Sequence, residues 1–167
     1  MTEKQNIEIK ARYEKHEYAE KVLEEKGARK EGLDMQKDTY FNVKNGRLKI
    51  REGKIENSLV YYQREDKEDP KTSDVSICDL ENPEEVKRVL KNCLGVKVIV
   101  EKEREIHWLE NVKVHLDRVE NLGKFIEFEL MKDKKGSYDT EEDLENLMDE
   151  FEVDRSRLID KSYSDMV

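Results

Sequence analysis

Cysteine and long apolar runs are scarce in this chain. The two cysteines, Cys78 and Cys93, have neither Cys-x-x-Cys spacing nor neighbouring histidine pairs, so the sequence indicates neither a zinc site nor a disulfide framework. No apolar run approaches the roughly 20 residues of a membrane span, and the first residues lack the apolar segment of a signal peptide. We therefore expect a soluble protein of a reducing, cytoplasmic compartment that does not enter a membrane.

Charged residues are abundant instead, and they set the next expectations. They make up 44% of the 167 residues against 35% hydrophobic residues, which by itself leans toward disorder. The apolar residues nevertheless recur with the periods of strands and helices, so we expect a folded chain. Its length fits a single domain that spans residues 1–167. A net charge of -9 argues against a nucleic-acid partner and against an anionic membrane surface.

The stretch Val112–Leu130 predicts a β-hairpin around a turn at residues 120–124. Apolar and ionisable residues alternate in both arms, which gives each arm one apolar and one charged face. Asp117, Glu127 and Glu129 then converge on one face of two neighbouring strands, and like charges at that spacing repel one another. A solvated sheet face and a divalent-cation site are both compatible with this hairpin alone.

Alternation predicts further strands, and helical spacing predicts three helices and a short terminal one. The strands are expected over 6–12, 38–43, 47–52, 59–65 and 96–108, with a short one around 75–77. Asn45-Gly46 is a strong turn signal between the second and third of these. Helices are expected over 18–26, over 83–94 with a buried stripe of Val86, Val89, Leu90 and Leu94, from 139 onward, and from about 154 with Leu158, Ile159 and Tyr163 inward.

Both signs of charge recur on the ionisable faces of these strands. The acidic residues are Glu8, Asp117, Glu127 and Glu129. The basic residues are Lys10, Arg12, Lys49, Arg51, Arg64, Lys102, Arg104 and Lys113. Such strands could form a flat sheet with one wet side or a closed barrel with a charged interior. The helices favour the barrel, because their apolar stripes need the apolar outer faces of the strands to cover.

A charged interior of this kind is unstable when empty, and a polyphosphate with divalent cations complements it. Carboxylates are hard oxygen ligands for Mg²⁺ or Mn²⁺, and lysine and arginine neutralise the remaining phosphate oxygens. His115 shares the ionisable face, but a lone strand histidine is more often a hydrogen-bonded bystander than an acid or a base.

Six segments together resemble the CYTH domain, which is named for class IV adenylyl cyclases and thiamine triphosphatases and is also called the triphosphate tunnel metalloenzyme family. The resemblance runs from Asn6 to about Tyr163, and it lies in the joint order and spacing of the segments. They are Ile7-Glu-Ile-Lys10, Asp38-Thr-Tyr-Phe41, Gly46-Arg-Leu-Lys-Ile-Arg51, Val100-x-Lys-x-Arg104, Lys113-Val-His-Leu-Asp117 and Leu122-Gly-x-Phe-x-Glu-x-Glu129.

The resemblance implies an α+β fold, a closed antiparallel eight-stranded β-barrel that forms a tunnel flanked by helices. It implies that Glu8, Asp117, Glu127 and Glu129 contact Mg²⁺ or Mn²⁺ and that, with Lys10, they form the catalytic set. The implied triphosphate-binding residues are Lys10, Arg12, Lys49, Arg51, Arg64, Lys102, Arg104, Lys113 and, from the C-terminal segment, Lys161. One departure is that Asn6 stands where the family signature has its first glutamate, and a neutral amide binds Mg²⁺ more weakly than a carboxylate.

The implied partner is a small-molecule triphosphate, and three functions follow from it. The first is hydrolysis that releases the terminal phosphate, which we place ahead of the second, cyclisation of ATP to cyclic AMP and pyrophosphate as in class IV adenylyl cyclases. The third is polyphosphate binding without catalysis, for which Asn6 is the best argument. The sequence leaves open whether the chain forms a homodimer.

Overall fold

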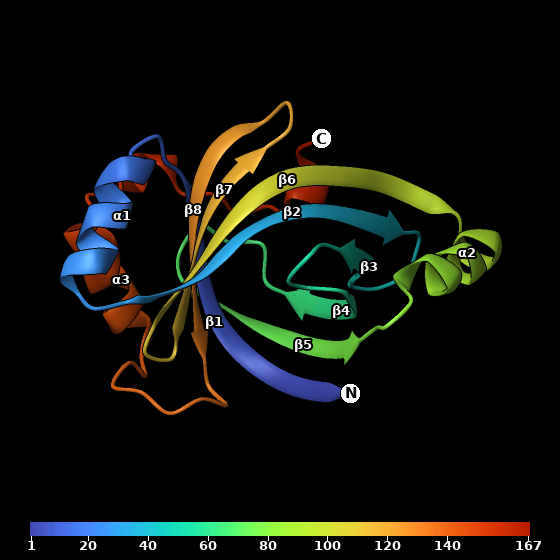
Figure 1. Ribbon diagram of the computed structural model, residues 1–167, viewed down its shortest axis with the longest axis horizontal. Helices are drawn as coiled ribbons and strands as arrows, with labels where there is room; N and C mark the ends of the chain where they lie inside the picture. Colours follow the sequence, from blue (N-terminus) through green and yellow to red (C-terminus); the bar gives the residue numbers. More distant parts are fainter.

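Eight antiparallel strands close into a barrel in the computed structural model, which describes residues 1–167 (Figure 1). The strands are β1 (Thr2–Arg12), β2 (Arg29–Phe41), β3 (Arg47–Glu52), β4 (Ser58–Arg64), β5 (Lys71–Asp79), β6 (Val96–Leu109), β7 (Val112–Val119) and β8 (Gly123–Met131). Their order around the barrel is β1-β5-β4-β3-β2-β6-β7-β8, so that β1 closes the sheet between β5 and β8. The predicted fold class is confirmed.

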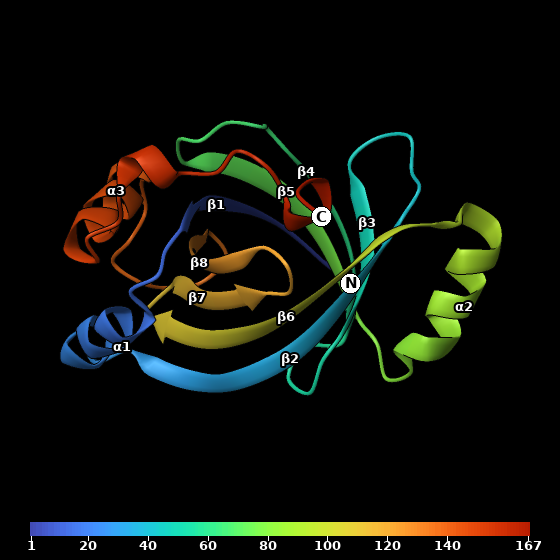
Figure 2. The ribbon, with the colours of Figure 1, turned by 90° about the horizontal axis from the view of Figure 1, so that it is seen from above.

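Three helices and two 3₁₀ turns accompany the barrel. They are α1 (His16–Glu25), α2 (Pro83–Leu94), α3 (Glu141–Glu150), η1 (Arg155–Arg157) and η2 (Tyr163–Asp165). Helices α1 and α3 lie together at one end of the molecule, and α2 lies at the other end (Figures 1 and 2). The barrel between them is therefore covered unevenly.

The main hydrophobic core lies between α1, α3 and the outer faces of β1, β7 and β8. Outward residues such as Ile9, Val114 and Phe128 are at most 1% exposed and pack with Leu23 of α1. The ring of Phe128 meets Phe151, just after α3, edge to face at 5.1 Å between centroids. For these strands the expectation that apolar faces point outward and charged faces inward is confirmed, because alternation sends every second side chain to the lumen.

Helix α2 does not have the predicted buried stripe. It begins with Pro83 and is followed by Gly95, as the sequence indicates, but none of its residues is buried and Val89 is 63% exposed. The helix lies beyond the ends of β2 and β6 rather than across the sheet, so no sheet face covers it (Figure 1). Amphipathic spacing predicted the helix correctly and its packing wrongly.

The outer face of β2 and β6 also lacks a helix. Leu33 is 55% exposed, Met35 53% and Ile99 44%. Strand β2 begins at Arg29, well before the expected start at Asp38, because pairing with the long β6 extends it through a segment that has no strong β-forming run.

The C-terminal segment closes part of the barrel instead of forming the expected short helix. After η1, the amide of Ile159 donates to the carbonyl of Lys10 at 2.9 Å, which ties the segment to β1. Ile159 and Tyr163 then join a second, smaller cluster with inward residues such as Val100 and Phe125. The interior is therefore charged along part of its length and aromatic or aliphatic beside η2.

None of the helices has the length and apolar character that crossing a bilayer requires.

Candidate functional site: a charged lumen

The barrel encloses one cavity of about 470 Å³, called the lumen below. Strands β1, β3, β4, β6 and β7 each send cationic side chains into it, because their inward positions fall at every second residue. The residues predicted from the sequence that line it are Lys10, Lys49, Arg51, Arg64, Lys102, Arg104 and Lys113, and the acidic ones are Glu8, Glu127 and Glu129.

Asp38 is the centre of one charge network that sequence reasoning missed. Its carboxylate accepts from Arg51 Nε and Nη2, each at 2.8 Å, from Lys102 Nζ at 2.8 Å and from Lys49 Nζ at 3.0 Å. Burial favours the neutral acid, but Arg51, Lys102 and Lys49 hold the pKa of Asp38 well below its usual range. The sequence held a signal for this contact, since the Asn45-Gly46 turn sets a register in which Asp38 faces Arg51.

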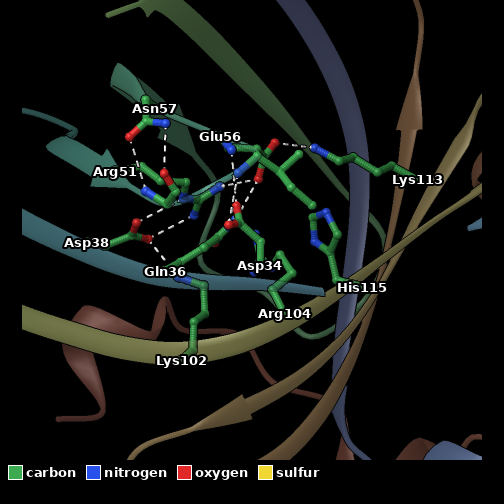
Figure 3. Close-up of polar contacts among 12 residues, drawn as sticks. Asp34, Gln36, Asp38, Arg51, Glu56, Asn57, Lys102, Arg104, Lys113 and His115 are labelled. Atoms are coloured by element: carbon green, nitrogen blue, oxygen red, sulfur yellow. Dashed lines mark hydrogen bonds and ion pairs between the residues drawn. The ribbon is translucent and has the colours of Figure 1, made fainter. Parts of the chain in front are cut away.

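Glu56 forms a second network from the loop between β3 and β4. Its Oε2 accepts from Lys113 Nζ at 2.6 Å, and its Oε1 accepts from Gln36 Nε2 at 2.8 Å and from Arg51 Nη1 at 3.3 Å (Figure 3). Opposing its desolvation, the charges of Lys113 and Arg51 lower the pKa of Glu56 well below the usual value. No periodicity marks a loop residue, so no signal in the sequence pointed to Glu56.

Asp117 points to the inside of the barrel but is covered by other side chains and does not line the lumen. It is 0% exposed, and Arg104 donates to both of its oxygens, Nε to Oδ1 at 2.8 Å and Nη2 to Oδ2 at 2.7 Å. The hydroxyl of Tyr163 donates to Oδ2 at 2.7 Å. Although burial opposes ionisation, the Arg104 guanidinium lowers the pKa of Asp117 strongly. In this arrangement the carboxylate orients Arg104, and each of its oxygens already accepts at least one hydrogen bond.

Glu8 and Glu127 each form an ion pair with a cation that also lines the lumen. Glu8 Oε1 accepts from Arg64 Nη1 at 2.5 Å. The two oxygens of Glu127 face different partners, since Oε2 lies 3.4 Å from Lys10 Nζ and Oε1 lies 3.4 Å from His115 Nδ1. Burial would raise the pKa of Glu127, but the charge of Lys10 brings it well below the usual value.

Glu129 has the opposite environment. Asn6 Nδ2 donates to its Oε1 at 2.7 Å, and no cation forms an ion pair with it. Burial raises the pKa of Glu129, and the neighbouring carboxylates Glu127 and Glu8 raise it further against the influence of Lys113. A carboxylate held among carboxylates in this way is more stable when a cation lies between them.

The residues around Glu129 fit a divalent cation. One ligand atom each from His115, Glu127 and Glu129 lies within 4.8 Å of the others. His115 is 2% exposed and neither ring nitrogen has a hydrogen-bond partner, and the buried Oδ1 of Asn6 has none either. Burial and the nearby Arg104 lower the pKa of His115 to about 4, so its imidazole is neutral near pH 7 and has a lone pair to offer. Sequence reasoning had treated His115 as a bystander.

Besides Asp117, two predicted residues do not line the lumen. Arg12 Nη1 donates to the carbonyl of Leu122 at 2.9 Å, and the guanidinium lies 5.1 Å from the centre of the Phe125 ring. Lys161 is exposed and precedes the buried Ser162, which is the residue that reaches the lumen. The alternation of side chains along β1 correctly placed Arg12 on the inner face, but Phe125 fills the barrel interior beside it.

Ser162, which lines the lumen, and the fully buried Lys71 were not predicted. Lys71 is 0% exposed, and its Nζ donates to the carbonyls of Lys67 at 2.9 Å and Ile159 at 3.1 Å. Burial lowers the pKa of Lys71 to about 8. Ser162 Oγ accepts from Arg64 Nη2 at 2.6 Å, so the C-terminal segment helps to position this arginine.

The fold and the site together define a class of protein, a closed barrel whose interior holds lysines and arginines beside carboxylates. The model of the CYTH domain matches residues 4–163, and the chain belongs to this family. The predicted family is thus confirmed. Its members depend on a metal, bind small molecules that carry a triphosphate, and include adenylyl cyclases and triphosphatases.

Solved structures share the fold over nearly the whole chain. The PH1012 protein from Pyrococcus horikoshii OT3 is 24% identical with a TM-score of 0.82, and 97% of this chain and 99% of that chain are covered. A conserved hypothetical protein from Pyrococcus furiosus is 18% identical with a TM-score of 0.81 and the same coverage. A proposed adenylate cyclase from Vibrio parahaemolyticus is 16% identical with a TM-score of 0.78, covering 98% and 97%. A comparison with curated proteins finds no match.

Proposed function

We propose that this chain is a divalent-metal-dependent phosphohydrolase that acts on a small molecule with a triphosphate and releases the terminal phosphate. One observation carries the proposal: cationic side chains of five strands surround a cavity of about 470 Å³ that also holds Glu8, Glu127 and Glu129. Lysine and arginine at several positions along one cavity suit an extended polyanion, and carboxylates beside them suit its metal ion.

The cation would be Mg²⁺ or Mn²⁺, held by Glu127 and Glu129 with His115 beside them. When bound, it would neutralise charge on the phosphate oxygens and lower the pKa of a water molecule. Lys10 would remain paired with Glu127 Oε2 and could still donate to a phosphate, because an ammonium has three N–H donors.

The cations around Asp38 would bind the phosphate chain. Lys49 and Lys102 each give a hydrogen bond to Asp38, which leaves N–H donors of both lysines free for phosphate oxygens. Arg64 and Arg104 are positioned by Ser162 and Asp117, respectively. Such preorganised donors stabilise the charge that is redistributed when water attacks the terminal phosphorus and the bond to the bridging oxygen breaks.

Cyclisation of ATP is the second candidate. It is supported by the family, which includes adenylyl cyclases, and by the neighbours from Vibrio parahaemolyticus and Bacillus halodurans that are named as proposed adenylate cyclases. In that reaction the ribose 3′-hydroxyl attacks the α-phosphorus and pyrophosphate leaves, so the same cations would serve a different attacking group.

Product analysis distinguishes the candidates. The protein is incubated with inorganic triphosphate or ATP and with Mg²⁺ or Mn²⁺, and phosphate, pyrophosphate and cyclic AMP are measured. Release of phosphate from either substrate, without cyclic AMP, is the expected result. Cyclic AMP with equimolar pyrophosphate would establish cyclisation instead. Tight binding of triphosphate without turnover under any of these conditions would leave a binding protein.

A further inference from the structure

Glu56 is the one lumen carboxylate that comes from a loop, the segment 53–57 between β3 and β4. Its side chain reaches between Arg51 and Lys113, two of the cations that we assign to phosphate binding (Figure 3). Gln36 holds the same carboxylate from β2 at 2.8 Å. The Glu56 carboxylate thus accepts hydrogen bonds from the same donors that a phosphate group at this place would use.

The loop that holds Glu56 is built rigidly. Asp34 of β2 accepts from the amides of Lys54 at 2.7 Å, Ile55 at 3.0 Å and Glu56 at 3.1 Å. A Cβ on Gly53 would lie 2.6 Å from Asp34 Oδ2, so this close approach of loop and carboxylate requires glycine. Asn57 adds two hydrogen bonds to the backbone of Gly53, at 3.2 and 2.8 Å. The position of Glu56 in the lumen is therefore fixed by the backbone rather than by its ion pairs.

The loop and the C-terminal segment both contribute residues to the lumen, and they lie at different ends of β3. Asp165 of η2 pairs with Arg47 at the start of β3, at 2.5 Å, and the Glu56 loop follows the last residue of the same strand. An extended anion that lies along the cations from Arg64 toward Arg51 would thus end at Glu56. A further phosphate at this end of the row of cations would find Arg51 and Lys113 already paired with Glu56 and would meet its carboxylate.

We propose that Glu56 is a specificity-determining residue that excludes an additional anionic group from the place beside Arg51 and Lys113 and so limits the length of the phosphate chain that the lumen accepts. The proposal rests on the proposed function, because it requires that the lumen binds polyphosphate. It places a neutral or hydrogen-bond-donating group, rather than a phosphate, beside Glu56.

The test measures the affinities of inorganic triphosphate and tetraphosphate by calorimetry, without metal and at constant ionic strength, for the wild-type protein and for Glu56→Gln. Glutamine keeps the size and one acceptor oxygen but removes the charge. We expect tetraphosphate to bind at least tenfold more tightly to the variant than to the wild-type protein, which corresponds to about 1.4 kcal/mol, and triphosphate to gain less.

Glu52→Gln is the matched control, because Glu52 ends β3 but pairs with Lys87 of α2 outside the lumen, at 2.8 Å. Thermal unfolding confirms that each variant folds. If the affinity for tetraphosphate rises no more in Glu56→Gln than in Glu52→Gln, or if the affinities for both anions rise equally, the proposal is wrong. A wild-type protein that binds neither anion would contradict the proposed function instead, so the two failures are distinguishable.

Discussion

The carboxylate of Asp38 accepts hydrogen bonds from three cations. Around Glu129, by contrast, two carboxylates, an amide and an imidazole lie together, and the amide and the imidazole have acceptor atoms without hydrogen-bond partners. Both groups lie inside the same barrel and face the same cavity. Under the proposed function, the group around Asp38 is already satisfied in the folded chain, and the group around Glu129 would be satisfied when a cation binds. The comparison also corrects the expectation that a charged interior is unstable when empty, since internal carboxylates already neutralise much of the lumen's positive charge without a ligand.

Replacement of Asp38 should produce the largest effect. In Asp38→Asn, Lys49, Arg51 and Lys102 lose their shared counterion while they stay buried, and removal of one member of a buried ion pair typically costs about 3–5 kcal/mol. We expect a fall of this size in the free energy of unfolding, measured by urea denaturation without metal.

The matched control for Asp38 is Asp74→Asn, since Asp74 is exposed and accepts only from Gln5 in the structure. It should change the free energy of unfolding by less than about 0.5 kcal/mol. Equal free energies of unfolding for Asp38→Asn and the wild-type protein would show that the group around Asp38 does not stabilise the fold.

Catalysis should depend on the group around Glu129. Glu127→Gln removes the carboxylate between Lys10 and His115, and we expect metal-dependent turnover to fall roughly 1000-fold, because a catalytic metal supplies several kcal/mol. Arg51→Ala should instead mainly raise KM. Steady-state kinetics of phosphate release separates the two effects, and full activity of Glu127→Gln would refute the metal assignment.

Acid should weaken the metal-free protein through His115. The pKa of His115 is lowered to about 4, so the unfolded chain takes up a proton below pH 6.5 that the folded protein does not take up until about pH 4. Its contribution to stability is complete above pH 6.5 and is lost as the pH falls toward 4.

His115→Gln should remove this part of the pH dependence. The stability difference between wild type and variant should then shift by up to about 3 kcal/mol between pH 7 and pH 4, in urea unfolding at several pH values. A constant difference across this range would show that the ring is not held neutral by the fold.

Glu129→Gln should have the smallest effect on stability and the opposite sign to Asp38→Asn. The pKa of Glu129 is raised, mainly by burial and by neighbouring carboxylates, so its charge is unfavourable without a metal. A glutamine keeps the acceptor for Asn6 and should leave the metal-free protein equally stable or up to about 1 kcal/mol more stable. A loss of stability as large as that expected for Asp38→Asn would contradict the difference between the group around Asp38 and the group around Glu129.

The sequence was sufficient for the barrel and for most of the charged lumen. Alternation with a period of two places Glu8, Lys49 and Lys102 on the charged faces of their strands, and the closed barrel turns these faces inward. Register around the Asn45-Gly46 turn could also have located Asp38, since it places this residue opposite Arg51.

What the sequence could not reveal depends on contacts that no period encodes. Glu56 reaches the lumen from a loop whose course is fixed by Asp34, a residue far from it along the chain. Helix α2 has an amphipathic pattern but lies beyond the sheet, so spacing did not predict its exposure. The role that we propose for His115 depends on two ring nitrogens without hydrogen-bond partners next to Glu127 and Glu129, a proximity that no sequence period encodes.

Binding of Mn²⁺ without substrate tests the central claim most directly. Electron paramagnetic resonance should detect Mn²⁺ bound to the wild-type protein, with coupling to one nitrogen from His115, since imidazole is a suitable ligand for transition metals beside carboxylates. The nitrogen coupling should disappear in His115→Gln, and Glu127→Gln should lose most of the bound metal. Absence of bound Mn²⁺, or unchanged binding in Glu127→Gln, would contradict the account of the group around Glu129.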